Sequence, residues 1–217
     1  MRISETDSIL DLGCGEGSIT IPIAKKTKKV TAIDSSKRML EILESKCIYE
    51  NINNVKIIKG NLETVTKEEV GKHDIVLLSR SINGIYKIKE TLANINSIAN
   101  KYVYITIFGP DNWKFEKDFY ALIDKEDHGF APYNYLFNIL VTMEIYPNVE
   151  NLEIKSNRTY DSIDDAIANG KWNLDNFTEE EKDKLYDYLK KNLAKNENGK
   201  LENPNDKSDW ILIWWKK

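Results

Sequence analysis

Short apolar runs alternate along the chain with longer segments whose apolar residues recur at helical spacing. Five such runs lie in the first half, at residues 8–12, 29–34, 55–60, 74–79 and 102–108. Most of them are continuously apolar rather than alternating, which is typical of strands covered on both faces. The pattern predicts parallel strands joined by crossover helices, and hence an α/β fold arranged as a three-layer αβα sandwich.

Helical spacing is clear in the segments between the runs. Residues 35–51 and residues 88–100 each place their apolar side chains three or four positions apart. Thr178 and Glu181 form a T-x-x-E capping box, which predicts that a further helix begins there.

The pattern changes after the fifth run. Residues 109–147 contain a turn and two helix-like segments, so we expect a helical insertion that covers the substrate site within a single domain of residues 1–217. A sixth strand is expected at residues 151–157. The run DWILIWW near the end of the chain is the candidate for a seventh.

Composition narrows the function classes without selecting one. The chain has 31 basic and 35 acidic side chains and a net charge of −4, so it carries no global field that would attract a nucleic acid. Its two cysteines have no zinc or disulfide spacing, and no metal site is predicted. The first residues lack a signal peptide's apolar stretch, and no run is long enough to cross a bilayer. We expect a cytoplasmic protein with no membrane partner.

The sequence DLGCGEG follows the first strand and carries the first candidate chemistry. Its glycines, Gly13, Gly15 and Gly17, allow a tight turn and a close approach of backbone N–H groups to a ligand. A dinucleotide fingerprint would require glycine at position 18, where this chain has serine. Asp11 would repel a pyrophosphate and suits a ligand that carries an ammonium group.

The ends of the second and third strands carry further polar groups. Asp34 lies about 20 residues after the first glycines, a position from which a carboxylate accepts hydrogen bonds from ribose hydroxyls. Asn61 and Leu62 follow the third strand, where an amide and an apolar group would meet an adenine edge and face. The expected ligand is a nucleoside with a charged amino-acid tail.

At this point the residues resemble a known family. ILDLGCGEG, AIDSS, IKGNLE and DIVLLS are similar to the first four motifs of the class I S-adenosylmethionine-dependent methyltransferases, which have a Rossmann-like fold. The resemblance covers about the first 110 residues, and the late strand DWILIWW matches the seventh strand of that family.

The resemblance implies a seven-stranded, mostly parallel sheet in the order 3-2-1-4-5-7-6, with the last strand antiparallel. It also implies S-adenosyl-L-methionine as the cofactor, lying over the carboxyl ends of the first two strands. Carried over position by position, the cofactor-binding residues are Asp11, Gly13, Gly15, Gly17, Asp34, Ser35, Asn61, Leu62, Ser79 and Arg80.

Catalytic residues are harder to assign, because methyl transfer from a sulfonium mainly requires alignment and exclusion of water. An acidic nucleophile would still need a base, and His128 and Tyr133 in the insertion are the candidates. The alternative for His128 is a loop histidine beside a solvated carboxylate. Arg80 would clamp a substrate carboxylate or phosphate, or would pair with a nearby acid.

Several functions stay open from the sequence. The leading hypothesis is methylation of a small molecule by in-line displacement, with a protein or RNA acceptor as the second choice. The stretch LLSRSING lacks the Asn/Asp-Pro-Pro-aromatic turn of enzymes that methylate nucleobase amines. Other classes are an NAD(P)-dependent oxidoreductase, disfavoured by Asp11 and Ser18, and a non-catalytic nucleoside-binding protein.

Overall fold

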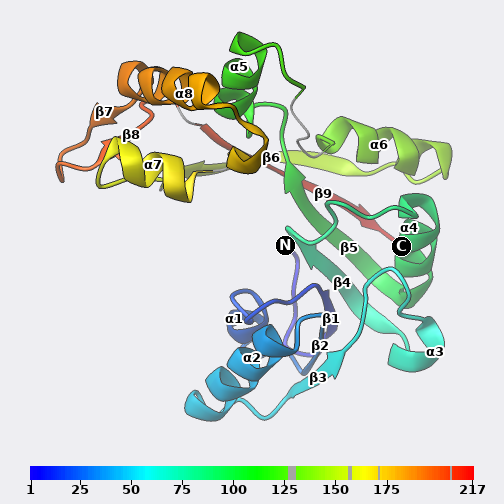
Figure 1. Cartoon of the computed structure of the whole chain (residues 1–217). Coiled ribbons are helices and arrows are strands. Elements are labelled where there is room, and N and C mark those ends of the chain that lie inside the picture. Colours follow the sequence, from blue (N-terminus) through cyan, green and yellow to red (C-terminus); the bar gives the residue numbers. More distant parts are fainter. Residues whose placement is uncertain (127–130, 156–157, 171, 206) are drawn as a thin grey trace. The chain divides into compact units, whose positions relative to one another are not determined.

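Seven strands form one sheet within the part of the chain that the computed structural model describes, namely residues 1–126, 131–155, 158–170, 172–205 and 207–217 (Figure 1). The strands are β1 (Ser8–Leu12), β2 (Lys29–Asp34), β3 (Val55–Lys59), β4 (His73–Ser79), β5 (Ala99–Phe108), β6 (Asn148–Lys155) and β9 (Lys207–Lys216). Their order is β3-β2-β1-β4-β5-β9-β6. Since β9 is the predicted seventh strand, the predicted order is confirmed.

The sheet is mixed, as predicted. β1 to β5 pair in parallel, so their carboxyl ends meet at one edge. The backbone N–H of Lys217 donates to the carbonyl of Lys101 at 2.9 Å, and that of Gly109 donates to the carbonyl of Asp209 at 2.8 Å. Residue numbers therefore rise along β5 as they fall along β9, so these two strands are antiparallel.

Helices cover both faces of the sheet. Ala32 packs in one apolar cluster with α1 (Thr20–Ala24) and α2 (Lys37–Tyr49). Its neighbour Ile33 packs in another cluster, which includes side chains of α4 (Ile88–Ile98) and α6 (Tyr133–Thr142). Because successive residues of a strand point to opposite faces, the two clusters lie on opposite sides of β2. The three-layer arrangement is thereby confirmed, and the short α3 (Lys67–Val70) also belongs to this half of the chain.

The chain divides into two compact units. The first comprises Met1–Phe108, Phe130–Asn151 and Ile211–Lys217, and the second comprises Gly109–Gly129 and Leu152–Trp210. The predicted insertion, residues 109–147, is thus shared between them. A single domain with an insertion over the substrate stays a prediction.

The second unit is mainly helical and has its own core. Its elements are α5 (Lys114–Leu122), α7 (Ile163–Asn169), the 3₁₀-helix η1 (Leu174–Asn176), α8 (Glu179–Asn192) and the strands β7 (Ala194–Lys195) and β8 (Leu201–Glu202). Phe119, Phe177 and Leu185 are buried at its centre. The Thr178–Glu181 capping box forms at the start of α8, which confirms the predicted helix start. No helix in the described ranges combines the length and apolar character needed to span a bilayer.

Candidate active site

The glycine turn between β1 and α1 forms the base of the candidate site. Gly13, Gly15 and Gly17 have φ angles of +75°, +54° and +86°, in the left-handed region that favours glycine. A Cβ on Gly13 would lie 2.3 Å from the Cβ of Ser81, and one on Gly17 would lie 2.4 Å from Cδ1 of Leu43. A Cβ on Gly15 would meet no heavy atom of the described residues within 4 Å. Packing therefore fixes two of the glycines, whereas Gly15 borders open space that a ligand can use.

Asp34 links the end of β2 to this turn. Its Oδ2 accepts a hydrogen bond from the N–H of Gly15 at 2.8 Å, and its Oδ1 accepts one from the N–H of Ser36 at 2.8 Å. The carbonyl of Ile33 also accepts from the N–H of Gly13 at 2.8 Å. An ionised carboxylate has about four acceptor positions, so Asp34 retains capacity for ribose hydroxyls.

Asp11 lies beneath the turn and is 1% exposed. Its Oδ2 accepts a hydrogen bond from the Thr20 hydroxyl at 2.6 Å, which ties the end of β1 to the first residue of α1. Burial raises the pKa of Asp11 to about 6, the Thr20 hydrogen bond opposes that rise, and the charge of Asp34 adds to it. This arrangement fits the predicted role in orienting the turn, while contact with the amino end of the cofactor stays a prediction.

The predicted adenine-binding residues follow β3 at the same edge of the sheet. The N–H of Gly60 donates to the carbonyl of Asp34 at 3.1 Å, so the loop is anchored to β2. Asn61 is exposed, and its Oδ1 accepts a hydrogen bond from the N–H of Glu63 at 2.9 Å. Leu62 packs against the main core, which is the apolar cluster that contains Ile33, and its Cδ2 would lie 3.7 Å from a Cβ on Gly13. An exposed amide beside an apolar side chain fits an adenine ring.

The end of β4 has an unusual backbone conformation. Arg80 has a φ of +58°, which is uncommon for a residue with a Cβ, and its side chain is exposed. Its N–H donates to both the carbonyl and the hydroxyl of Thr106 in β5, at 3.2 and 3.0 Å. The Ser79 hydroxyl lies 3.3 Å from the same Thr106 hydroxyl. The structure thus brings Ser79 and Arg80 to the predicted edge, and β5 fixes them there. Ser35 lies exposed after β2 at that edge.

Sequence reasoning missed two residues at this edge, Ser81 and Thr106. The Ser81 hydroxyl donates to the carbonyl of Leu12 at 2.7 Å and packs against Gly13. Thr106 holds the backbone of Arg80, as described above. Single hydroxyl residues belong to no motif, and only their place at the carboxyl ends of β4 and β5 could have indicated them.

Cys14, inside the glycine turn, is buried. Burial raises the pKa of its thiol, and the charges of Asp11 and Asp34 raise it further. The side chain therefore stays a neutral thiol, which suits a packing role rather than a nucleophile.

An apolar pocket of 220 Å³ lies within the first unit, lined by the loop after β4, the end of β5 and the start of α6. Tyr135 lines it, whereas Tyr133 is half-buried and packs against the main core. His128 lies outside the described residues. The catalytic roles of His128 and Tyr133 stay predictions.

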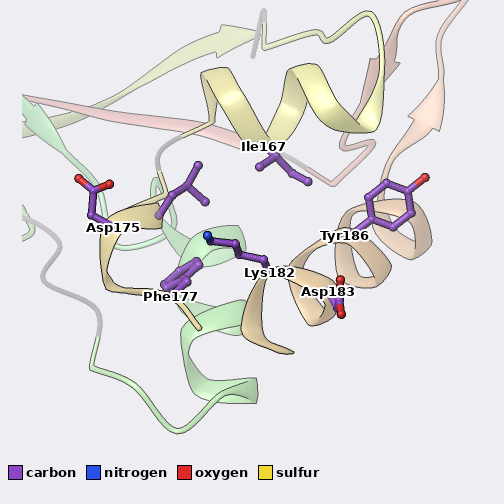
Figure 2. Close-up of a pocket in the computed structure, with 7 residues that line it drawn as sticks. Ile167, Asp175, Phe177, Lys182, Asp183 and Tyr186 are labelled. Carbon is purple, nitrogen blue, oxygen red and sulfur yellow. The ribbon is translucent and has the colours of Figure 1, made fainter. Parts of the chain in front are cut away.

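Another groove, of 600 Å³, lies within the second unit (Figure 2). Ile167 of α7 and Phe177 contribute apolar surface to it, and Asp175, Lys182 and Asp183 contribute charge. The ammonium group of Lys182 pairs with Glu179 at 2.7 Å. None of the predicted cofactor-binding residues lines this groove.

The chain is similar to known proteins along most of its length. The sequence model of the family described as "Methyltransferase domain" matches residues 3–192. An uncharacterized protein of Haemophilus influenzae is 29% identical over 222 residues, covering 99% of this chain and 78% of that protein.

Solved structures show the same fold. The YcgJ protein of Bacillus subtilis superposes with a TM-score of 0.64 at 14% identity, covering 100% of this chain and 94% of that one. Magnesium protoporphyrin IX methyltransferase of Synechocystis PCC 6803, solved with bound S-adenosylhomocysteine, superposes with a TM-score of 0.56 at 18% identity, covering 69% of each chain.

Proposed function

This chain belongs to the methyltransferase domain family, and on that premise we propose that it transfers a methyl group from S-adenosylmethionine to a small-molecule acceptor by in-line displacement. Membership makes it a class I methyltransferase with S-adenosylmethionine as its cofactor. The nature of the acceptor is our proposal.

The pocket in the first unit is the observation that carries this proposal. Ile82 follows β4 and Ile107 lies near the end of β5, and both line the pocket. Open α/β sheets bind their ligands outside the carboxyl ends of the strands. A cavity of 220 Å³ is smaller than the 300–1,000 Å³ typical of pockets for drug-sized ligands. It suits a small molecule, or a small part of one, better than an extended chain.

The distribution of charge supports the same choice. The first unit contains 18 basic and 15 acidic side chains, a net charge of +3, whereas the second contains 13 basic and 20 acidic ones, a net charge of −7. A phosphate backbone would be repelled by the second unit and only weakly attracted by the first. Protein or RNA remains the alternative acceptor class.

The cofactor, when bound, supplies a methyl group already activated by the positive charge on sulfur. The protein then has to hold the acceptor in line and exclude water. We assign the alignment to the loop after β4, because Thr106 and the backbone of Arg80 fix it to β5. Arg80 and Ser79 would line the methionine side of the cofactor.

We assign proton removal from an acidic acceptor to His128, with Tyr133 as the other candidate. His128→Ala should lower turnover more than it lowers cofactor affinity. Steady-state kinetics together with calorimetric titration of S-adenosylhomocysteine would test this, and unchanged turnover would remove His128 from the mechanism.

A labelling experiment tests the acceptor class. The protein is incubated with S-adenosylmethionine carrying a tritiated methyl group and with a cell extract separated by dialysis into small molecules and macromolecules. Tritium should appear in dialysable compounds other than S-adenosylmethionine itself, and Asp34→Ala should strongly reduce that incorporation. Incorporation only into protein or RNA would refute a small-molecule acceptor while leaving the methyltransferase activity intact.

A further inference from the structure

The pocket of the first unit has a chemical character that narrows the acceptor. Nine of its eleven lining residues are aliphatic or glycine, and five of these are isoleucines. None of the eleven is Asp, Glu, Lys, Arg or His, and Asn83 and Tyr135 supply the polar side-chain atoms. We propose that this pocket takes an uncharged hydrocarbon part of the acceptor, a single aromatic ring or a short alkyl chain. This inference rests on the proposed function.

Part of the pocket wall belongs to the hydrophobic core and is therefore formed before any ligand binds. Ile82, Ile107 and Leu136 are buried in the main core, where they pack with side chains of α4 and the sheet. The loop that carries Ile82 is also fixed, because the preceding Ser81 donates to the carbonyl of Leu12 at 2.7 Å. A preformed apolar pocket binds an apolar group without the cost of ordering its own side chains.

Such a pocket discriminates strongly by charge. A carboxylate or ammonium group placed among isoleucine side chains would lose its hydration and find no oppositely charged side chain among the eleven lining residues. In contrast, each additional methylene group of a ligand that is buried in the pocket should raise the affinity about fourfold. The pocket should therefore prefer an uncharged compound over an otherwise similar ion by at least about tenfold.

Size and polarity limit how the acceptor lies. A dry cavity of about 150 Å³ suffices for benzene, so 220 Å³ accommodates one substituted ring. Tyr135 lines the pocket and is 61% exposed, which places its side chain at the opening. The hydrocarbon end of the acceptor should enter the pocket, with its polar end near Asn83 and Tyr135.

Methyl NMR tests the inference directly on the intact protein. With isoleucine δ1-methyl groups labelled with ¹³C, p-cresol should shift the signals of Ile82, Ile107 and Ile139. Matched 4-hydroxybenzoate, which replaces the methyl by a carboxylate, should bind at least about tenfold more weakly. From phenol to p-cresol to 4-ethylphenol, affinity should rise about fourfold at each step. Equal binding of the carboxylate, or shifts confined to other isoleucines, would overturn the proposal.

A pair of variants provides a control. Ile139→Phe adds bulk at the pocket and should weaken p-cresol binding at least about tenfold while S-adenosylhomocysteine still binds. Ile48→Phe makes the same change on α2, at a side chain that is 74% exposed, and should alter neither affinity. Unchanged p-cresol binding in a folded Ile139→Phe protein would contradict the assignment, and the phenol series decides the matter should that variant not fold.

The two proposals can fail separately. Ligand binding in the NMR titration does not depend on methyl transfer, so label found only in macromolecules would leave the apolar preference standing. Transfer to a charged, hydrophilic small molecule without shifts at the pocket would refute the apolar acceptor and leave the small-molecule methyltransferase.

Discussion

Replacing two glycines of the same turn by alanine should have different effects, because their surroundings differ. Gly13 and Gly15 both have positive φ angles, so an alanine at either position costs about 1–2 kcal/mol of backbone strain. At Gly13 the new Cβ would also lie 2.3 Å from the Cβ of Ser81. Overpacking of this kind costs about 1–3 kcal/mol. Gly13→Ala should therefore lower the free energy of unfolding by about 2–5 kcal/mol, and Gly15→Ala by about 1–2 kcal/mol.

Cofactor affinity should be strongly affected at Gly15, although this position has the smaller expected loss of stability. The Cβ of Gly15→Ala would project into open space, at a residue whose N–H is bonded to the Asp34 carboxylate and where we expect the cofactor. Affinity for S-adenosylhomocysteine should fall at least about tenfold although the protein remains folded. Urea unfolding measures the stability loss of each variant, and calorimetric titration measures the affinity.

A double substitution separates clash from strain. Adding Ser81→Gly to Gly13→Ala removes the clashing Cβ but leaves the positive φ at residue 13. The double variant should therefore regain the about 1–3 kcal/mol of stability that the clash costs. Loss of the Ser81 hydrogen bond to Leu12 reduces this gain by about 1 kcal/mol. Equal stability losses for the two single variants, or wild-type cofactor affinity in Gly15→Ala, would refute the reasoning.

Three further substitutions test other parts of the structure. Burial lowers the pKa of His73, so the unfolded chain binds a proton near pH 6.5 that the folded protein resists. The free energy of unfolding should therefore fall as the pH drops below about 6.5. Urea midpoints of His73→Gln should lack that loss, whereas the opposite contribution of Asp11 is common to both proteins. Thr106→Val removes a hydroxyl that accepts a hydrogen bond from the backbone N–H of Arg80. It should cost about 1 kcal/mol of stability and lower kcat with little change in cofactor affinity. An unchanged kcat would count against a positioning role for Thr106. Arg158→Met would leave the Glu116 carboxylate, which is 2% exposed, without the guanidinium that lies 2.6 Å away. The free energy of unfolding should fall by about 3 kcal/mol, the lower end of the range for breaking a buried pair, because Arg158 is 28% exposed. A fall of less than about 1 kcal/mol would contradict this.

The sequence predicted the sheet well because its strands are buried on both faces. Continuous apolar runs mark β1 and β2 at their observed bounds. β5 begins three residues before the predicted start, since Asn100 and Lys101 are exposed polar residues that carry no apolar signal. The strands β7 and β8 have two residues each, too few to leave a hydrophobic pattern.

The helix α6 shows where the pattern was less informative. Its sequence is apolar on most sides, a pattern that favours burial against the sheet and a second neighbour. Leu136 and Leu140 are buried, whereas Tyr135 and Val141 are exposed. Composition alone does not reveal which side of a uniformly apolar helix meets the core.

The sequence likewise indicates some residues of the candidate site and not others. The glycines and Asp34 follow a spacing expected of residues that bind one ligand, so the sequence indicates them as candidates. The hydroxyls of Thr20, Ser81 and Thr106 act through neighbours that the fold brings close: Asp11, Leu12 and Arg80. Their contribution depends on strand adjacency and loop conformation, which no single-residue pattern encodes.

The most direct test of the account is a calorimetric titration of S-adenosylhomocysteine into the wild-type protein and into Asp34→Ala. The glycine turn and the Asp34 carboxylate should bind this nucleoside in the wild type, and losing the carboxylate should weaken binding by at least about tenfold. NAD should release no heat with either protein. Unchanged affinity in Asp34→Ala, or binding of NAD without binding of S-adenosylhomocysteine, would contradict the cofactor site described here.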